Sequence, residues 1–508
     1  MLPSRKLALC TGIGLVLTLG GLYSTKWWGQ QPLQGVGEQA AEAAKPVQPD
    51  AWWKERALAA EEQGRMDVAA DYRARIEAFR LSQEPAAATP VPAAADGGKA
   101  VPPLAASSLY VAKPLPERKA PLALHEPVHG TYLGMLGADR RVGYDTSRIE
   151  GVYGRKHAMY LSYVGWRKFQ ADTQTYFPKR TADRVKELGG SLQIGWEPRY
   201  GLDDVKDDEY VRTFAKEAKA SGIPVFLRYA SEMNGAWVPW YGDPKKYIEK
   251  FRLVHDIMAE EAPNVAMVWS PNFLPANNID EYYPGDAYVD WVGFSLYATP
   301  LTGGKEHLDY NVIDYFEPLY RKYSHKPIMI SEGAVAHTVL EGEKAYEIWA
   351  EGQLGYMYGL LPRMFPQVKA ILYFNFSRAQ AVRSKMEYVY DLGENLYLDG
   401  KYRRLIGSDW FLSQVEQGGS SPVSYTYDRL AAASLPAGKH KIMAYAKPEG
   451  KEWPFAVAVY QGDRRLGISY EMPWEMDIEV APGQANADWR IVAYNRSMEP
   501  MGSGTYQP

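Results

Sequence analysis

The sequence contains a single cysteine, Cys10, and only eight histidines among its 508 residues. One cysteine excludes an intrachain disulfide framework and any zinc site built from cysteines. The histidines are scattered and show neither HxxxH nor HExxH spacing. A catalytic metal is therefore not expected, and the chemistry is predicted to need no cofactor.

Neither sign of charge is in large excess. The chain has 57 basic and 61 acidic residues, for a net charge of −4, so neither a nucleic acid nor a polyanionic substrate is predicted as a partner. Aromatic residues, by contrast, make up 13% of the sequence. In a largely polar chain this excess indicates aromatic side chains on the surface or in a groove as well as in the core.

The N-terminus has the pattern of a membrane signal. Arg5 and Lys6 precede residues 7–25, which are uncharged, mostly apolar and long enough to cross a bilayer as a helix. No clear small-x-small cleavage site follows. We therefore predict an uncleaved signal-anchor over residues 1–28. It would make a single pass through a bacterial inner membrane and place the remaining chain in the periplasm or at the cell surface.

Two further segments precede the predicted catalytic part. Residues 50–82 show the periodicity of two short amphipathic helices, typical either of one tetratricopeptide-like hairpin or of a charged stalk. A single hairpin cannot bury its own apolar face, so the first interpretation requires a partner surface, such as a protein partner, or self-association. Residues 83–127 are rich in alanine and proline, which predicts an extended linker.

Short β-rich runs alternate with helical patterns between residues 128 and 415. Eight such repeats predict a (β/α)8 TIM barrel of the α/β class. A doubly wound sheet is disfavoured because no glycine-rich phosphate turn follows the first run. The expected strands are residues 130–136, 157–165, 191–196, 223–230, 264–270, 289–297, 326–331 and 368–376.

The last part of the chain, residues 420–508, has a different pattern. Its β-rich runs alternate apolar and polar positions, and Gly462-Asp463 has the composition of a hairpin turn. A small β-sandwich is predicted. This domain either binds carbohydrate or serves as a packing or spacer domain.

Glutamates follow three of the expected barrel strands. Catalytic groups of TIM barrels lie at the C-terminal ends of the strands, and Glu197, Glu232 and Glu332 each occupy such a place. Glycoside hydrolysis requires two carboxylates beside one bond, with one protonated as general acid and the other ionised as nucleophile or base. The fourth and seventh strands face each other across the barrel, so Glu232 and Glu332 are expected to converge on one substrate.

The stretch around Glu232, residues 228–242, reads RYASEMNGAWVPWYG. It combines charged and amide side chains with aromatic rings, as sugar sites do, where flat apolar faces stack on pyranose rings. Arg228 is expected to support the carboxylates through charge-assisted hydrogen bonds. The candidate substrate-binding residues are Ser231, Asn234, Trp237 and Trp240 within this stretch, and Glu197, Trp269 and Asn272 outside it.

Three of these candidates have a second interpretation. Glu197 can pair with Arg199 instead of binding a hydroxyl group. Trp269 can pack in the core, and Asn272 can satisfy a loop backbone. The sequence leaves these alternatives open.

Four motifs together resemble the catalytic barrels of family 26 glycoside hydrolases, which include β-mannanases: RYASEMNGAWVPW, VWSPN, YYPGDAYVDWVGFSLY and KPIMISEG. They occur in order, each on its expected strand, and the resemblance covers roughly residues 128 to 415. It implies a retaining mechanism with Glu232 as general acid/base and Glu332 as nucleophile, about 5–5.5 Å apart. Tyr297 matches a family tyrosine that hydrogen-bonds the nucleophile, and Trp237 resembles a subsite wall.

One position departs from the family pattern. Family members typically carry histidine directly before the acid/base, in HEMNG, whereas this chain has Ser231. That side chain is expected near the nucleophile and near the sugar at the cleavage point. Serine carries no charge and reaches less far, so the resemblance does not extend to mannan specificity.

The function predicted from these features is that of a membrane-anchored, exported, retaining glycosidase. It would cleave a β-linked polysaccharide internally, and the cell's own exopolysaccharide is a candidate substrate. A sugar-binding component of a polysaccharide export or assembly complex, with weak or no catalysis, is the alternative that the anchor and hairpin favour. The presence of Glu232, Glu332 and Tyr297 argues against it. A transglycosylase with the same chemistry is a further alternative.

Overall fold

The computed structural model describes residues 49–62, 64–66, 69–70, 72–74, 76–77, 101–117, 121–169, 171, 174–430, 435–482 and 488–506. The predicted signal-anchor, residues 1–28, lies outside the described residues, as do residues 83–100 of the predicted linker. Among the helices that are described, none combines the length and the apolar character needed to cross a membrane.

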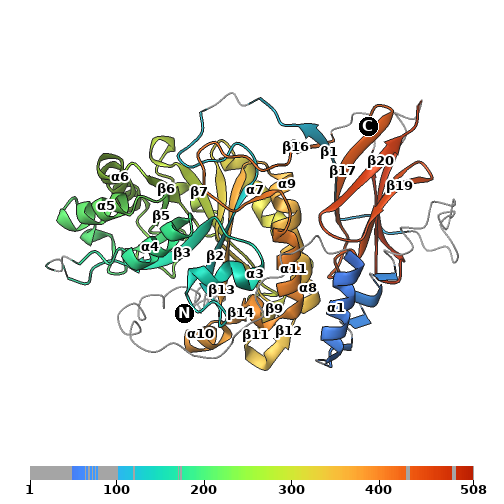
Figure 1. Ribbon diagram of the computed structural model, residues 1–508, viewed down its shortest axis with the longest axis horizontal. Helices are drawn as coiled ribbons and strands as arrows, with labels where there is room; N and C mark the ends of the chain where they lie inside the picture. Colours follow the sequence, from blue (N-terminus) through green and yellow to red (C-terminus); the bar gives the residue numbers. More distant parts are fainter. Residues whose placement is uncertain are drawn as a thin grey trace, which may run out of the picture.

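Eight parallel strands close into a barrel, which confirms the predicted architecture (Figure 1). The ring closes where β13 pairs with β2, from Ala370 opposite Tyr132 to Phe376 opposite Ala138. Nearly every strand residue is buried because side chains face either the barrel interior or the surrounding helices. The strands are β2 (Thr131–Ala138), β3 (Met159–Gly165), β4 (Ser191–Glu197), β5 (Val225–Tyr229), β6 (Val265–Trp269), β7 (Trp291–Ala298), β10 (Ile328–Val335) and β13 (Val368–Phe376).

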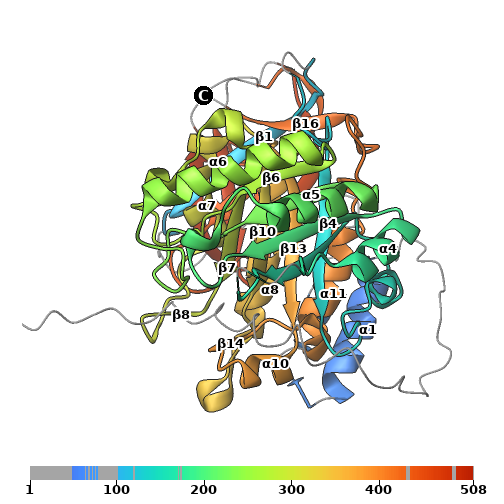
Figure 2. The ribbon, with the colours of Figure 1, turned by 90° about the vertical axis from the view of Figure 1, so that its left-hand side faces the viewer.

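Helices cover the outside of the barrel, and α4, α5 and α6 lie in front of the strands in Figure 2. Asp208 and Asp243 cap the N-termini of α5 and α6 through their side chains. The connection between β6 and β7 contains two 3-10 turns in place of an α-helix, so the predicted strand–helix alternation fails there. The main helices are α3 (Ile149–Tyr153), α4 (Lys179–Glu187), α5 (Glu209–Ser221), α6 (Pro244–Glu261), α7 (Val312–Tyr323), α8 (Glu347–Gly355), α10 (Arg378–Arg383) and α11 (Leu396–Ile406).

Two four-stranded antiparallel sheets form a second domain. Their orders are β16-β1-β17-β20 and β19-β18-β21-β22, and the buried Trp474 and Trp489 come one from each sheet. Seven of the eight strands fall in the region where the sequence predicts a sandwich. These are β16 (Tyr425–Arg429), β17 (Gly438–Lys447), β18 (Ala456–Gln461), β19 (Arg464–Ser469), β20 (Trp474–Val480), β21 (Trp489–Tyr494) and β22 (Pro500–Tyr506).

The eighth strand, β1 (Ala106–Pro114), corrects the predicted linker over residues 83–127. It lies inside the first sheet, where Tyr110 pairs with Arg429 on one side and Met443 on the other. Leu109 and its neighbours are buried there. Alanines and prolines dominate the composition of residues 83–127, so composition alone predicts a linker. The short strand β1 within this segment is stabilised by pairing with its two neighbouring strands.

The N-terminal helix α1 (Pro49–Glu62) packs on α11, and Figures 1 and 2 both place it beside that helix. Trp53 is buried in this contact, with the guanidinium of Arg404 lying 5.3 Å from its ring centroid. The barrel of the same chain therefore covers the apolar face of the predicted hairpin. The partner surface that the hairpin interpretation requires is thus supplied by the same chain. The free stalk and the separate protein partner predicted for residues 50–82 are corrected.

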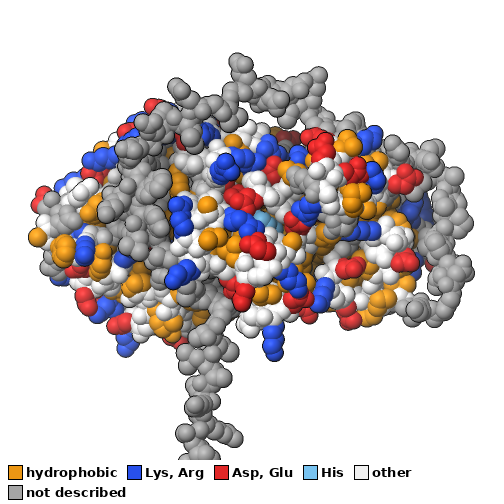
Figure 3. All heavy atoms as spheres, turned by 90° about the horizontal axis from the view of Figure 1, so that it is seen from below, with side chains coloured by type: hydrophobic (Ala, Val, Ile, Leu, Met, Phe, Trp, Pro, Cys, Tyr) orange, Lys and Arg blue, Asp and Glu red, His pale blue; other side chains and the backbone are white. Residues whose placement is uncertain are grey.

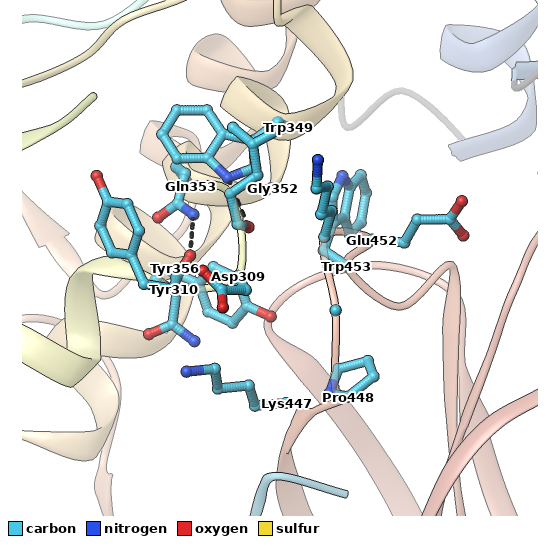
Figure 4. A pocket seen from close by; sticks show the side chains of 14 residues that line it. Asp309, Tyr310, Trp349, Gly352, Gln353, Tyr356, Lys447, Pro448, Glu452 and Trp453 are labelled. Carbon is cyan, nitrogen blue, oxygen red and sulfur yellow. Dashed lines mark hydrogen bonds between the residues drawn. The ribbon is translucent and has the colours of Figure 1, made fainter. Parts of the chain in front are cut away.

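The barrel and the sandwich meet around a small cavity between α8 and the loop after β17 (Figure 4). Trp453 from the sandwich lies against Gly352, where a Cβ would come within 2.6 Å of the indole ring. The Trp453 indole donates to the carbonyl of Ile348, and Trp349 donates to that of Leu308. Trp453 thus links the sandwich to the barrel.

Candidate active site

The first catalytic candidate, Glu232, lies in the tight turn that follows β5. Its backbone is in the left-handed region, with φ of 59°, and its amide donates to the carbonyl of Ser270 at 2.8 Å. A residue other than glycine in this region costs about 1–3 kcal/mol, and such strain persists where neighbouring structure enforces it. The turn fixes the direction of the Glu232 side chain at the C-terminal end of the barrel.

The second candidate, Glu332, lies on β10 and is fully buried. Both of its oxygens accept a hydrogen bond from a tyrosine: Tyr297 donates to Oε1 and Tyr163 donates to Oε2. Burial, followed by the charge of Glu332, raises the pKa of both phenols well above the ordinary value. Both tyrosines therefore stay protonated and act as donors that orient the carboxylate.

One guanidinium group links the two glutamates. Arg228 Nη1 donates to Glu332 Oε2 at 2.8 Å, and Arg228 Nη2 lies 3.7 Å from Glu232 Oε1. Burial disfavours the charge of Arg228, but its carboxylate neighbours outweigh burial and raise its pKa. A buried cation thus sits between the carboxylates and stabilises negative charge on Glu332.

Three serines fix the position of this guanidinium. Arg228 Nε donates to Ser270 Oγ at 2.9 Å, and Nη2 donates to Ser295 Oγ at 2.6 Å. Ser270 in turn shares a hydrogen bond with Ser331 at 2.7 Å. The hydroxyls satisfy the donors that the two glutamates leave free, so the buried arginine is well paired.

The surroundings of Glu232 differ from those of Glu332. Trp237 Nε1 donates to Glu232 Oε2 at 2.8 Å, and Asn272 Nδ2 donates to Oε1 at 3.1 Å. Burial and the nearby charge of Glu332 nevertheless raise the pKa of Glu232 to about 7. Glu232 can therefore carry a proton near neutral pH, while Glu332 is ion-paired with Arg228. A general acid and a nucleophile require these two different environments.

Comparisons with known proteins agree with this geometry. Residues 205–356 match the family model for glycosyl hydrolase family 26, and both glutamates lie within the match. The barrel is therefore similar to family 26 glycoside hydrolases over the part that carries both glutamates. The resemblance seen in the four sequence motifs is thereby confirmed.

Relatives are similar over part of the chain. Endoglucanase H from Acetivibrio thermocellus is 32% identical over 216 residues, which are 39% of this chain and 23% of that enzyme. Beta-1,3-xylanase TXYA from a Vibrio species is 37% identical over 81 residues, which are 15% of this chain and 17% of the xylanase. The chain therefore covers less than a quarter of the length of either relative.

Among solved structures, a modular endo-beta-1,4-mannanase from Cellulomonas fimi is 16% identical. The similarity covers 74% of this chain and 93% of the mannanase, with a TM-score of 0.42. A beta-mannanase of the same family from Bacteroides ovatus is 15% identical, covering 56% of this chain and 90% of that chain, with a TM-score of 0.40.

The barrel brings together most of the side chains predicted from the sequence. Glu232, Glu332, Arg228 and Tyr297 form one connected network of ion pairs and hydrogen bonds. Trp237 is half-buried and joins this network through Glu232. Their convergence is confirmed, and their roles in catalysis stay predictions.

Three predicted substrate-binding residues lie behind the site instead. Trp269 is fully buried, with its indole donating to the carbonyl of Tyr282 at 3.1 Å. Asn234 is also fully buried and holds the backbone of Asn272 through two hydrogen bonds of 2.9 Å. Trp240 is buried and donates to the carbonyl of Ser231 at 2.8 Å. None of the three has the accessible surface needed to stack on or hydrogen-bond a sugar.

These three side chains keep the Glu232 turn in shape. Asn234 positions Asn272, whose own amide reaches Glu232, and Trp240 braces the backbone of Ser231. Ser231 itself is buried in the same turn, so its influence on sugar specificity stays a prediction. Asn234, Trp240 and Trp269 are therefore buried behind the site, and the prediction that they bind substrate is wrong.

Glu197, at the end of β4, pairs with Arg199 through contacts of 2.8 and 2.7 Å. The alternative of an ion pair is thus the one observed. Burial raises the pKa of Glu197 even though Arg199 opposes the change. The pair lies close enough to the catalytic network for Glu197 to be coupled electrostatically to Glu332 and Arg228.

Tyr163, which donates to Glu332, is not identified from the sequence, and neither are the three serines around Arg228. It lies in the second expected strand, YLSYVG, two residues before the strand ends at Gly165. Its ring occupies space that exists because Gly195 has no side chain: a Cβ there would come within 2.8 Å of the ring. A polar residue near the end of one barrel strand, beside a glycine on the next, is the signal that would have revealed it.

Replacing Gly235 with alanine is expected to displace Trp237 from Glu232. A Cβ at this position would lie 2.2 Å from the indole ring, so the ring must move and its hydrogen bond to Glu232 breaks. That bond favours the ionised carboxylate, so its loss raises the pKa of Glu232 and shifts the alkaline limb of the activity profile to higher pH. We expect kcat to fall about tenfold, which corresponds to about 1.4 kcal/mol of barrier.

The measurement is a pH profile of kcat/KM for both proteins. Gly151→Ala is the matched control, because nothing lies within 4 Å of where its Cβ would be. An unchanged alkaline limb in Gly235→Ala would show that Trp237 does not act on Glu232.

Proposed function

We propose that the protein is a retaining glycoside hydrolase that cleaves a β-linked polysaccharide within the chain. The observation that carries the proposal is the Arg228 guanidinium between two buried carboxylates, Glu232 and Glu332. Burial and the charge of Glu332 raise the pKa of Glu232 to about 7. The similarity to family 26 supports the same conclusion. The names of the relatives, an endoglucanase and a beta-1,3-xylanase, suggest β-glucans and β-1,3-xylan as the first substrates to test.

The reaction that fits this geometry has two displacements. Glu332 attacks the anomeric carbon while Glu232 gives its proton to the departing glycosidic oxygen, which forms a glycosyl-enzyme ester. Glu232, now ionised, then takes a proton from water, and the water oxygen displaces Glu332. Tyr297 and Arg228 hold Glu332 in place, and its charge in the free enzyme is balanced by Arg228.

A sugar-binding protein without catalysis accounts less well for the turn around Glu232. A binder gains nothing from a strained acidic residue whose pKa lies near 7. Transglycosylation uses the same two steps with a sugar hydroxyl in place of water. The products separate the two reactions, because transfer gives oligosaccharides longer than the starting material.

The test is cleavage of a panel of β-glucans, β-1,3-xylan and β-mannan by the wild-type protein. We expect viscosity to fall well before many reducing ends appear, as internal cleavage requires. Proton NMR within the first minutes should show the β-anomer of the product before mutarotation sets in, because two displacements retain configuration. First appearance of the α-anomer would contradict the retaining mechanism, and no cleavage of any polymer would contradict the proposed activity.

Export and membrane attachment belong to the same proposal. Arg5 and Lys6, followed by the apolar residues 7–25, support an anchor that leaves the barrel outside the cytoplasm. There the barrel would meet an extracellular polymer, the cell's own exopolysaccharide included. Fractionation tests this: the full chain should stay with the membranes after alkaline carbonate washing, and recovery in the soluble fraction would contradict an uncleaved anchor.

A further inference from the structure

Where the structure describes side-chain exposure, four aromatic side chains are largely exposed. They are Tyr144 at 55%, Phe169 at 64%, Tyr200 at 56% and Tyr241 at 45%. A single exposed aromatic residue needs no explanation. The positions of these four, however, are not scattered.

Each of the four follows a different barrel strand at its C-terminal end. Tyr144 follows β2, Phe169 follows β3, Tyr200 follows β4 and Tyr241 follows β5. These four strands are neighbours, in the order β5-β4-β3-β2. The aromatic residues therefore lie along one half of the barrel mouth, on the face that carries Glu232 and Glu332.

The other half of the mouth is built differently. Ion pairs link its loops to one another: Lys344 with Glu306, and Arg378 with both Glu343 and Glu394. The loops after β6, β7, β10 and β13, all within the described residues, present no aromatic side chain of comparable exposure. The elements that follow these strands, such as α10, lie at the lower edge of Figure 1, and Figure 3 shows basic and acidic side chains interspersed over this side of the molecule.

Two of the exposed aromatic residues lie next in sequence to residues that contact or surround the catalytic pair. Tyr241 lies in the same loop as Trp237, whose indole donates to Glu232. Tyr200 directly follows Arg199, which pairs with Glu197 beside the catalytic network. The loops that carry Tyr241 and Tyr200 thus also carry side chains that contact or surround the catalytic pair.

We propose that the bound polysaccharide leaves the catalytic pair across the loops after β5, β4, β3 and β2, with its sugar rings stacked on Tyr241, Tyr200, Phe169 and Tyr144. This inference rests on the proposed function and adds the direction in which the bound polysaccharide runs across the barrel mouth. Stacking suits a β-linked polymer because its pyranose rings expose flat CH faces, and aromatic faces bind these without requiring a particular charge.

A triple variant tests the direction: Phe169→Ala with Tyr200→Ala and Tyr241→Ala. We expect kcat/KM for a long polymer to fall about tenfold or more, as the loss of one or two stacking contacts would produce. For the shortest oligosaccharide that the wild type cleaves, we expect kcat/KM to stay within about twofold, because such a substrate does not reach these residues. Circular dichroism and thermal unfolding establish that the variant is folded.

Two controls accompany the variant. Tyr200→Phe with Tyr241→Phe keeps both rings, so its kcat/KM on the polymer should lie well above that of the triple variant. Leu58→Ala removes a side chain that is 60% exposed on α1. It should leave kcat/KM unchanged on both the long and the short substrate. Equal losses on short and long substrates, or no loss on the polymer, would overturn the proposed path.

A second readout separates this inference from the proposed function. Affinity electrophoresis in gels containing the polymer measures binding without turnover, in a Glu332→Ala background. Loss of retardation on adding the triple substitution supports the path even if the wild type cleaves nothing, an outcome that would refute only the activity. Unchanged retardation together with normal cleavage by the wild type would refute only the path.

Discussion

Replacing Glu332 with alanine is expected to lower kcat on every cleaved polysaccharide by about 10⁴-fold or more, since removing a catalytic nucleophile leaves only binding and the remaining charged groups. The substitution deletes the group that forms the glycosyl-enzyme ester. It also leaves Arg228 without its 2.8 Å partner. Initial rates of reducing-sugar release, compared with the wild type, measure the effect.

The missing charge itself affects folding, which calls for a second variant. Truncating one partner of a buried pair typically costs about 3–5 kcal/mol, so Glu332→Ala is expected to melt at a lower temperature than the wild type. Glu332→Gln keeps the shape and part of the hydrogen bonding to Tyr297 and Tyr163, and it should be inactive with a smaller loss of stability. Sodium azide added to Glu332→Ala should yield the α-glycosyl azide, because azide enters the space of the deleted carboxylate. Wild-type activity in either variant would refute the nucleophile.

The barrel could be predicted because its pattern is repeated along the chain. Each of the eight expected strands overlaps an observed one, and each ends where a loop carries polar residues. β1 could not be predicted in the same way, because its partners, β16 and β17, lie more than 300 residues further on in the sequence. The composition of residues 106–114 does not indicate a pairing with strands so distant in the sequence. The docking of α1 on α11 escaped prediction for the same reason.

The position of the site could be predicted because catalytic residues follow the ends of the barrel strands. The direction in which each side chain points could not be predicted from the sequence. Trp269 and Ser270 are consecutive, and alternation along a strand sends them to opposite sides. Ser270 faces inward and holds Arg228, so Trp269 faces outward and packs near Tyr323. A strand buried on both sides is apolar throughout, so the sequence does not reveal which residues face the interior.

Replacing Glu232 with alanine should produce a loss that depends on the leaving group. Poor leaving groups need the proton that Glu232 supplies, so kcat/KM on polysaccharide is expected to fall about 10²–10⁴-fold. An aryl glycoside with an acidic phenol leaves without that proton, so its first step should proceed at nearly the wild-type rate. A burst of phenol followed by slow turnover is then expected, because the second step lacks its base. An equal loss on both substrates would contradict the role of acid/base.

The pH dependence provides the independent check. A general acid must be protonated, and burial next to Glu332 raises the pKa of Glu232 to about 7. Activity should therefore be retained below pH 7 and fall as the pH rises through that value, whereas an ordinary carboxyl group would already have lost its proton near pH 4.3. The alkaline limb near pH 7 should disappear from the profile of Glu232→Ala. Azide should restore turnover of the aryl glycoside and give the β-glycosyl azide, opposite in configuration to the product from Glu332→Ala, because it enters on the face that Glu232 vacates. A limb that stays near pH 7 in Glu232→Ala would assign it to another group, such as Glu197, whose pKa is also raised by burial.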